Sequence, residues 1–260
     1  MSEKISIEQE GAVARVILNR PENHNALTPA MIARLRDVFL ELGEAASVRV
    51  IVLQGEGRSF CAGADLAAMR EAAEFTFEEN VADGQAIFDL MNAVDRCPRP
   101  VVGAIHGVAI GGGAGLVSCC DVALATSGTL FAFSETRLGI MPAVISPFVV
   151  AKTGIGPLRE LYLTGERFTA ERAHQIGLIQ HVVADKQVLD VAVQERVKQL
   201  LLAAPGAQAD VKVMLREIGR LPEQELRPYT SELIARRRAS EEGREGMSAF
   251  LEKRKPGWQQ

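Results

Sequence analysis

The sequence predicts an α/β protein with a largely parallel sheet that is buried on both faces, followed by a helical C-terminal appendage. Strongly apolar segments of strand length occur at 48–53, 101–105 and 121–125, and helical or small-residue segments separate them. Strands that alternate with helices indicate right-handed crossovers and parallel pairing. Beyond residue 156 helical patterns dominate and charged residues become frequent. These observations favour one main domain with helices packed on its sheet.

The first part of the chain supplies a hairpin and a capped helix. Residues 5–8 and 13–18 lie on either side of a Glu-Gly turn, and we expect them to form a hairpin that contributes a second layer. Thr28 is a favourable N-cap, and Pro29 occupies the preferred first helical position. Apolar residues at helical spacing follow, so the pattern predicts a helix that Gly43 stops.

The later elements are mostly helical. Residues 75–94 have the pattern of a long amphipathic helix, which the following prolines end. One more strand is expected at 178–183. The charged C-terminal segments should form helices that are partly exposed or pack on another subunit, at 208–220, 224–240 and 243–253.

Composition excludes several classes of protein. Of the 260 residues, 47% are hydrophobic and 24% charged, so neither wholesale disorder nor a fibrous repeat is expected. The net charge of −4 gives no reason to expect a nucleic-acid partner, because such binders normally carry a basic face. Residues 1–10 lack the layout of a signal peptide, and no apolar run reaches membrane-spanning length. We therefore expect a cytoplasmic protein without a membrane partner.

The cysteines and histidines form no recognisable metal site. Neither C-x-x-C nor H-E-x-x-H occurs, and the adjacent Cys119 and Cys120 should point to opposite sides of their segment. We interpret these two residues, together with Cys61 and Cys97, as reduced and small members of the core. No metal is expected in the functional site.

Residues 59–66, Ser-Phe-Cys-Ala-Gly-Ala-Asp-Leu, form a loop of small residues between a buried strand and a short helix. Small side chains allow a ligand to approach the backbone closely. Gly63 can adopt a positive φ that turns the N–H of Ala64 toward a cleft, where it could donate to an oxygen anion. For this segment alone, a tight turn without a binding role is the alternative.

A second glycine-rich segment, 107–115, follows the strand at 101–105. A helix that begins within it would point unpaired N–H groups outward, and Gly112 would supply a second donor. The run does not match G-x-G-x-x-G, because Leu116 occupies the place of the last glycine, which disfavours a dinucleotide site. Close packing of the helix on the sheet is the alternative here.

Two convergent donors would stabilise the enolate of a thioester, but chemistry on an enoyl group also needs a proton carrier. Glu135 is the candidate, because apolar residues precede it and partial burial would raise its pKa. The alternative is a capping carboxylate or an ion pair with Arg137. No G-x-S-x-G elbow occurs, which disfavours a serine hydrolase.

Five ordered motifs resemble the enoyl-CoA hydratase/isomerase (crotonase) superfamily over nearly the whole chain, at 19–27, 59–66, 107–116, 133–142 and 246–255. The resemblance implies an α/β, ClpP/crotonase-like spiral of β-β-α units over residues 1–200. It also implies a helical C-terminal trimerisation region over 201–260, and a homotrimer or a dimer of trimers.

The resemblance further implies roles for individual residues. Ala64 and Gly112 match the oxyanion donors, and Glu135 matches the second of two acidic residues that hydratases of the family use. An acyl-coenzyme A thioester is then the substrate, and no separate cofactor is expected. The residues that match the coenzyme A route are Ala26, Ala62, Asp65 and Leu66, and Gly115 is also expected to contact the substrate.

Other coenzyme A contacts are implied to come from a neighbouring subunit. Phe250 and Lys253 match positions that contact the adenine and the 3′-phosphate. Ala67 stands where many members have another lysine. Phosphate affinity should therefore be weaker or come from elsewhere.

The chain departs from the family pattern at Gly115, where fatty-acid hydratases have their first glutamate. A single carboxylate suffices to move a proton between two carbons, as a Δ3,Δ2-enoyl-CoA isomerase requires, and could also position water and deliver its proton. Residues 113–117 and 138–147 resemble bacterial methylglutaconyl-CoA hydratases of leucine degradation, which favours hydration. A non-catalytic acyl-CoA binder is the remaining alternative.

Overall fold

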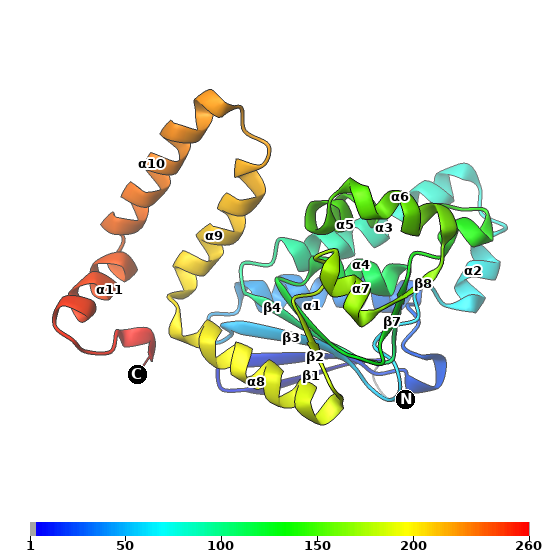
Figure 1. Cartoon of the computed structure of the whole chain (residues 1–260), viewed down its shortest axis with the longest axis horizontal. Helices are drawn as coiled ribbons and strands as arrows, with labels where there is room; N and C mark the ends of the chain where they lie inside the picture. Colours follow the sequence, from blue (N-terminus) through cyan, green and yellow to red (C-terminus); the bar gives the residue numbers. More distant parts are fainter. Residues whose placement is uncertain (1–3, 260) are drawn as a thin grey trace.

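The computed structural model describes residues 4–259 and contains a six-stranded sheet in the order β1-β2-β3-β4-β6-β9 (Figure 1). β1 and β2 are antiparallel, and every other neighbouring pair is parallel. The strands are β1 (Ile5–Glu10), β2 (Val13–Leu18), β3 (Val50–Gly55), β4 (Val101–Ile105), β6 (Val122–Thr126) and β9 (His181–Val183). The predicted parallel sheet is confirmed.

The second layer does not come from the early hairpin, so that prediction was wrong. β2 pairs in parallel with β3 along its whole length, from Val13 opposite Val50 to Leu18 opposite Gly55, which places the hairpin at the edge of the main sheet. The second sheet consists instead of β5 (Val108–Ile110), β7 (Leu130–Ala132) and β8 (Arg167–Thr169), in that order. Each of these strands has three residues, too few to show an alternating pattern in the sequence.

Helices cover both faces of the main sheet. Thr28 caps the first helix by accepting from the N–H of Met31, as predicted, but this helix continues one residue past Gly43. Thr76 begins the long third helix with a complete capping box. The helices of the core are α1 (Pro29–Glu44), α2 (Leu66–Ala72), α3 (Phe77–Asp95), α4 (Gly112–Cys119), α5 (Ser146–Thr153), α6 (Ile155–Thr164), α7 (Ala170–Gln175) and α8 (Lys186–Leu202), with 3-10 turns η1 (Pro21–Asn23) and η2 (Glu135–Leu138).

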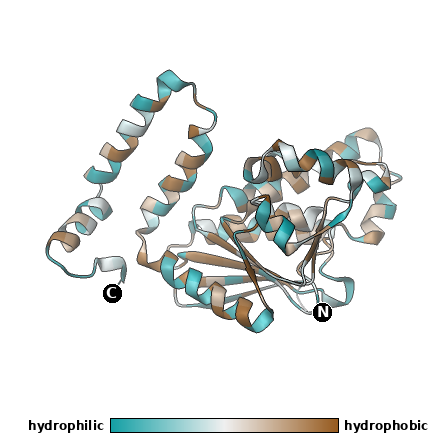
Figure 2. Ribbon diagram, viewed as in Figure 1, coloured by the Kyte–Doolittle hydropathy of each residue, from teal (hydrophilic) through white to brown (hydrophobic). Residues whose placement is uncertain are grey.

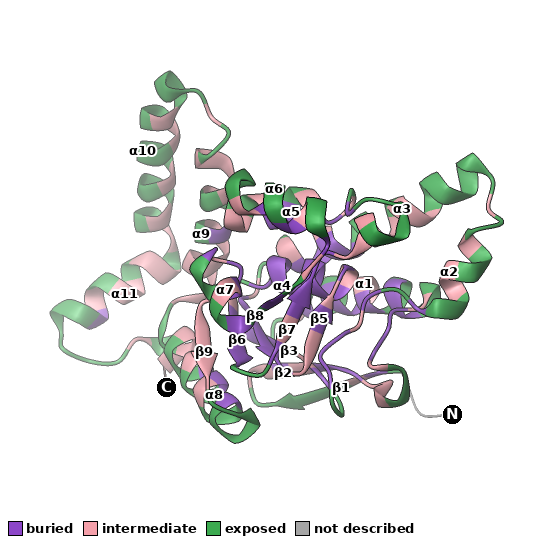
Figure 3. Ribbon diagram, turned by 45° about the vertical axis from the view of Figure 1, so that its right-hand side comes forward, coloured by how far each residue is buried: buried purple, intermediate pink, exposed green. Residues whose placement is uncertain are grey.

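The strand β3 shows why the sheet needs helices on both sides. Ile51 and Leu53 belong to the large core under α1, α3 and α4, whereas Val50 and Val52 face a second cluster under α8. Alternate residues of one strand point to opposite faces of the sheet. Because the residues on both faces of β3 are apolar, helices must cover both faces to exclude water from them. Figure 3 shows the buried residues concentrated in the central strands of the main sheet and in α4.

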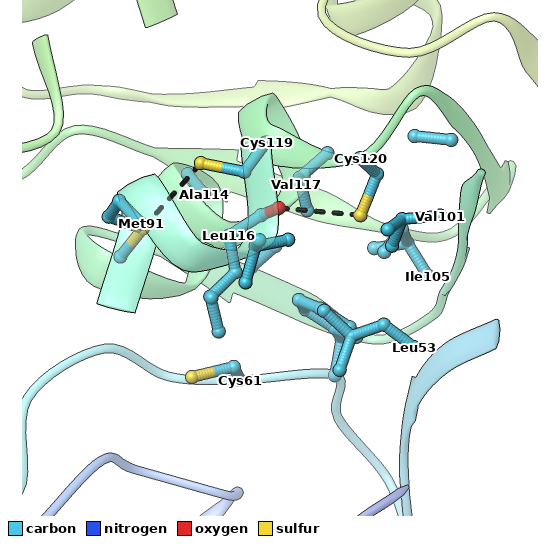
Figure 4. Close-up of a cluster of buried hydrophobic side chains, with 14 of the residues drawn as sticks. Leu53, Cys61, Met91, Val101, Ile105, Ala114, Leu116, Val117, Cys119 and Cys120 are labelled. Carbon is cyan, nitrogen blue, oxygen red and sulfur yellow. Dashed lines mark hydrogen bonds between the residues drawn. The ribbon is translucent and has the colours of Figure 1, made fainter. Parts of the chain in front are cut away.

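The cysteines lie in the apolar core (Figure 4). Cys119 contacts the sulfur of Met91, whereas Cys120 points the other way and donates to the carbonyl of Leu116. All four cysteines are free and buried, which confirms their interpretation as reduced core residues. Burial raises the pKa of the Cys61 and Cys120 thiols to about 12.

The C-terminal helices form an arm that extends away from the core (Figure 1). The arm consists of α9 (Pro205–Ile218), α10 (Glu223–Ala239) and α11 (Glu241–Leu251), followed by η3 (Gly257–Gln259). Hydrophilic and hydrophobic residues are interspersed along it (Figure 2), and most of its residues are exposed or half-buried (Figure 3). No helix between residues 4 and 259 is long and apolar enough to cross a membrane.

Candidate active site

Two backbone segments lie side by side next to the small second sheet. Cys61 forms a parallel bridge with Ala109 of β5. The N–H of Cys61 donates to Val108 at 3.0 Å, and the N–H of Ile110 donates to Cys61 at 3.0 Å. Because the two segments run in the same direction, this register carries the chain after Cys61 alongside the start of α4.

Gly63 and Gly112 meet where these segments end. Gly63 has a φ of +93°, and a Cβ atom on it would lie 2.8 Å from the carbonyl oxygen of Ile110 and 3.7 Å from the nitrogen of Gly112. Such a contact excludes any larger residue at 63. The glycine therefore allows the Ala64 peptide to approach Gly112.

The N–H of Ala64 is left free by its neighbours. Leu27 bonds to both flanking residues, donating to the carbonyl of Gly63 at 2.7 Å and accepting from the N–H of Asp65 at 3.0 Å. This bridge turns the Ala64 N–H away from Leu27, and no acceptor for it occurs within residues 4–259. The donor is available to a ligand.

Gly112 is the first residue of α4, as the glycine run predicted. The first intrahelical bond runs from the N–H of Gly115 to the carbonyl of Gly111, so the N–H of Gly112 has no helical acceptor, and none from elsewhere in the described chain. A Cβ on Gly113 would lie only 2.3 Å from the carbonyl oxygen of Cys61. This contact is with the loop at 59–66, so it is not the packing on the sheet considered as an alternative, and it brings the two donor segments together.

Glu135 reaches the same place from η2. A Cβ on Gly111, which has a φ of +52°, would lie 3.0 Å from Oε1 of Glu135, so the carboxyl group stands beside the start of α4. Oε2 is buried and has no hydrogen-bond partner among the described residues. Burial raises the pKa of Glu135, because the charged form loses hydration.

Of the two alternative roles considered for Glu135, the capping position is present, because the residue lies in the first turn of η2, whereas the ion pair with Arg137 does not occur among the described residues. Arg137 turns away, donating from Nε to the carbonyl of Thr164 at 2.9 Å. No ion pair of Glu135 occurs within the described residues. The carboxyl group of Glu135 therefore has no counter-ion among the described residues.

Gly115 lies one helical turn into α4 and is buried. A Cβ on it would lie 2.6 Å from Cγ2 of Ile145 and 3.2 Å from Cε of Met91. Ile145 therefore fills the space into which a side chain at 115 would project. The structure places an apolar wall where the family pattern has an acid, and a contact between Gly115 and substrate stays a prediction.

The residues expected along the coenzyme A route surround Ala64. Asp65 is joined through Arg20 to the carbonyl of Ala26, and the N–H of Ala62 donates to His24 at 2.9 Å. Ala26 and Asp65 are buried, whereas Leu66 is 71% exposed at the start of α2. The structure brings these four residues together, and their role in binding coenzyme A stays a prediction.

Phe250 and Lys253 lie elsewhere. They belong to the end of α11 and the turn after it, on the side of the arm remote from α2 (Figures 1 and 3). Phe250 is 82% exposed. The structure therefore does not bring these two residues to the site of their own chain, and a contact with coenzyme A across subunits stays a prediction.

Two residues of the site were missed by the sequence analysis. Arg20 pairs with Asp65, and its only signal was its place in the motif at 19–27. Ile145 packs on Gly115, and the sequence carries no signal for that contact. The His, Cys, Asp and Glu residues between 4 and 259 include no group that could hold a metal ion.

Comparisons with known proteins identify the family. The family model described as enoyl-CoA hydratase/isomerase matches residues 8–260. A putative enoyl-CoA hydratase from Thermus thermophilus is 32% identical over 95% of this chain and 98% of its own, and a crotonyl-CoA hydratase from Syntrophomonas wolfei is 31% identical over 97% and 96%.

Solved structures give the same answer. The crystal structure of an enoyl-CoA hydratase from Shewanella pealeana superposes with a TM-score of 0.95 and 38% identity, covering 98% of this chain and 96% of that one. The predicted crotonase-like fold is confirmed. The chain belongs to the enoyl-CoA hydratase/isomerase family.

Proposed function

We propose that this protein adds water to the double bond of a 2-enoyl-CoA thioester, or catalyses the reverse reaction. The observation that supports the proposal is that three groups without hydrogen-bond partners among residues 4–259 lie on neighbouring segments. These are the N–H groups of Ala64 and Gly112 and the buried carboxyl oxygen of Glu135. The coenzyme A moiety is part of the substrate, and the reaction as proposed needs no further cofactor.

The two N–H groups act on the thioester carbonyl. When a nucleophile adds at C3, negative charge moves onto the thioester oxygen, and both donors strengthen their hydrogen bonds to it. Removal of one donor of this kind in other enzymes raises the barrier by roughly 3–4 kcal/mol. Because Gly112 also begins α4, the positive end of the helix dipole adds to the stabilisation.

Glu135 carries the proton. Its carboxylate takes a proton from water while the water oxygen bonds to C3, and the resulting carboxylic acid gives that proton to C2 as the enolate collapses. Over the whole reaction the π bond between C2 and C3 and one O–H bond of water break, and one C–O and one C–H bond form. The raised pKa suits a group that must be both base and acid in one cycle.

A Δ3,Δ2-enoyl-CoA isomerase is the second candidate. Gly115 supplies no acid, and Ile145 occupies the space beside it, so the surroundings of position 115 are apolar. Such surroundings would favour a proton shuttle without water. Hydration is preferred because residues 113–117 and 138–147 resemble methylglutaconyl-CoA hydratases, and the Syntrophomonas relative is named a crotonyl-CoA hydratase.

The acyl group is proposed to be short or branched, with methylglutaconyl-CoA as one candidate. Arg137, which could have met a second carboxylate, is bonded to Thr164 instead, and Arg70 is exposed on α2. Ile145 and Met91 are buried apolar side chains that pack against Gly115, and the half-buried Val144 lies beside Gly84. Crotonyl-CoA is therefore the first substrate to test, with methylglutaconyl-CoA beside it.

We further propose a homotrimer or dimer of trimers in the cytoplasm. The helices of the arm enclose a groove of about 550 Å³ whose lining includes Val211, Met214, Leu233, Ile234, Met247 and Trp258. An apolar groove of this kind supports packing against another copy. Four free, buried thiols support a reducing compartment.

The test is a turnover screen. Loss of enoyl thioester absorbance with crotonyl- or methylglutaconyl-CoA supports hydration, whereas double-bond migration in a 3-enoyl-CoA without hydration supports the isomerase. Glu135→Gln should abolish either activity and leave the fold intact. Coenzyme A binding by calorimetry without turnover on any thioester would instead identify a non-catalytic binder.

A further inference from the structure

A buried ion pair lies next to the first oxyanion donor. Nη1 of Arg20 is 2.6 Å from Oδ2 of Asp65, and the two side chains are only 16% and 9% exposed. The same nitrogen donates to the carbonyl of Ala26 at 3.1 Å. One guanidinium group therefore ties the segment before Leu27 to the residue that follows Ala64.

Asp65 transmits this contact to the backbone. Its other oxygen, Oδ1, accepts from the N–H groups of Ala67 at 2.9 Å and Ala68 at 3.2 Å, which makes it the N-cap of α2. Its own N–H bonds to Leu27. The residue that follows Ala64 is thus fixed through both its side chain and its backbone N–H.

The segment that carries Arg20 is equally fixed. The N–H of Arg20 donates to Oδ1 of Asn25 at 2.8 Å, and Nδ2 of Asn25 donates to the carbonyl of Ser59 at 2.7 Å. Asn25 is fully buried, and both it and His24 have left-handed backbone angles, with φ of +56° and +51°. Two adjacent non-glycine residues in this region cost conformational energy, which persists only where the surroundings enforce it.

We propose that Arg20 is a positioning residue, which acts through Asp65 to aim the Ala64 N–H at the thioester oxygen. This inference rests on the proposed oxyanion role of Ala64. A donor contributes fully only when it points to where the charge develops, and a displacement of about 1 Å can cost on the order of a hundredfold in rate. The hydrogen bond from Arg20 lowers the pKa of Asp65, so the carboxylate stays ionised at neutral pH.

The alternative is an ion pair that only stabilises the fold or contacts coenzyme A. A stabilising pair would change the melting temperature and leave the chemistry of the folded enzyme unchanged. A coenzyme A contact would change KM and the affinity for free coenzyme A. A positioning role predicts lower kcat with little change in either.

The experiment compares Arg20→Met and Asp65→Asn with the control Arg34→Met. Arg34 pairs with Glu41 on the exposed side of α1, where the two side chains are 51% and 59% exposed. We measure kcat and KM for hydration, free coenzyme A affinity by calorimetry, and the carbonyl stretching frequency of a bound acyl-CoA with an isotope-labelled thioester carbonyl.

We expect kcat to fall about tenfold to a hundredfold in the first two variants, with the coenzyme A affinity of Arg20→Met within about twofold of wild type. The carbonyl frequency, lowered on binding to the wild type, should move back toward its value in solution. Arg34→Met should match the wild type. Arg20→Lys, which keeps the charge, should restore part of both kcat and the frequency shift.

Two results would overturn the proposal. One is a wild-type carbonyl frequency in folded Arg20→Met; the other is a loss confined to coenzyme A affinity. If Arg20→Met does not fold, Arg20→Lys and Asp65→Asn decide by the same spectrum. If the wild type lacks turnover but the carbonyl frequency of the bound acyl-CoA is lowered, only the hydratase function is overturned. The spectrum still reports the hydrogen bond from the Ala64 N–H to the thioester oxygen.

Discussion

Glu135 owes its proposed chemistry to what surrounds it rather than to its residue type. Its carboxyl group lies beside Gly111, one oxygen has no partner within the described chain, and Arg137 is bonded elsewhere. A buried carboxylate without a cation is less stable than one in water, so its pKa rises. That shift moves the group toward the pH at which it can exchange protons efficiently.

The pH dependence of the reaction should report this shift. Water addition begins with the carboxylate form, so kcat/KM should rise with pH along a limb centred above the ordinary range of glutamate pKa values. A limb at the ordinary value for glutamate would contradict the assignment.

The same shift predicts a stability effect with a defined sign. A carboxyl group whose pKa is raised in the folded state binds its proton more tightly there, so wild-type stability falls as pH rises from the ordinary pKa through the raised one. Glu135→Gln lacks that loss. In urea unfolding, the free energy of unfolding of Glu135→Gln relative to wild type should increase as the pH rises across this window and stay constant above it. A difference that does not depend on pH would contradict the prediction.

At the residue scale, the sequence predicted which groups could act but not how they are held. Gly63 and Gly112 stood out because glycine allows backbone approach, and Glu135 because apolar residues precede it. The Arg20–Asp65 pair joins residues 45 positions apart. Nothing local in either segment encodes that contact.

The helix α4 shows how an element positions the site. Gly113 allows α4 to approach the carbonyl oxygen of Cys61, and this approach sets Gly112 next to the loop that carries Ala64. A Cβ at 112 would meet only Cδ1 of Leu27, at an ordinary 3.7 Å. Two neighbouring glycines thus differ sharply in what they tolerate.

Alanine at these two positions should separate their roles. Gly113→Ala should lower the free energy of unfolding by about 1–3 kcal/mol, because the new methyl group clashes with backbone that cannot move independently. Gly112→Ala should be neutral or slightly stabilising, because alanine favours helix. Chemical denaturation of both variants provides the measurement, and equal stabilities would show that the close approach is not required.

Prediction of elements succeeded where the signals were long and failed where they were short. The helices α1 and α3 carry caps and a sustained apolar pattern, and both were found close to their observed bounds. The three-residue strands β5, β7 and β8 have no such pattern. The hairpin of β1 and β2 was predicted. The sheet to which it belongs depends on the parallel pairing of β2 with β3, for which the local sequence carries no signal.

The whole molecule suggests a site completed by a second chain. Phe250 is largely exposed on an arm that points away from its own core (Figure 1), while the site around Ala64 has no contribution from that arm. If the neighbour's Phe250 and Lys253 bind the nucleotide part of coenzyme A, each site needs two subunits. Light scattering should then give a trimer or a multiple of it.

Subunit mixing tests this sharing directly. Glu135→Gln should be inactive, and the double variant Phe250→Ala/Lys253→Ala should have a raised KM with kcat preserved. Co-expressed together, they should form some sites with both an intact Glu135 and an intact arm. Activity at low substrate should exceed the sum of the parents, whereas strict additivity would place each site within one chain.

The most direct test of the proposed oxyanion site is a crystal structure with a bound acyl-CoA. We predict that the thioester oxygen lies about 2.7–3.1 Å from the nitrogens of both Ala64 and Gly112, and that the carboxyl group of Glu135 faces C2 and C3. A thioester oxygen bonded to neither amide, with Glu135 turned away from the acyl chain, would contradict it.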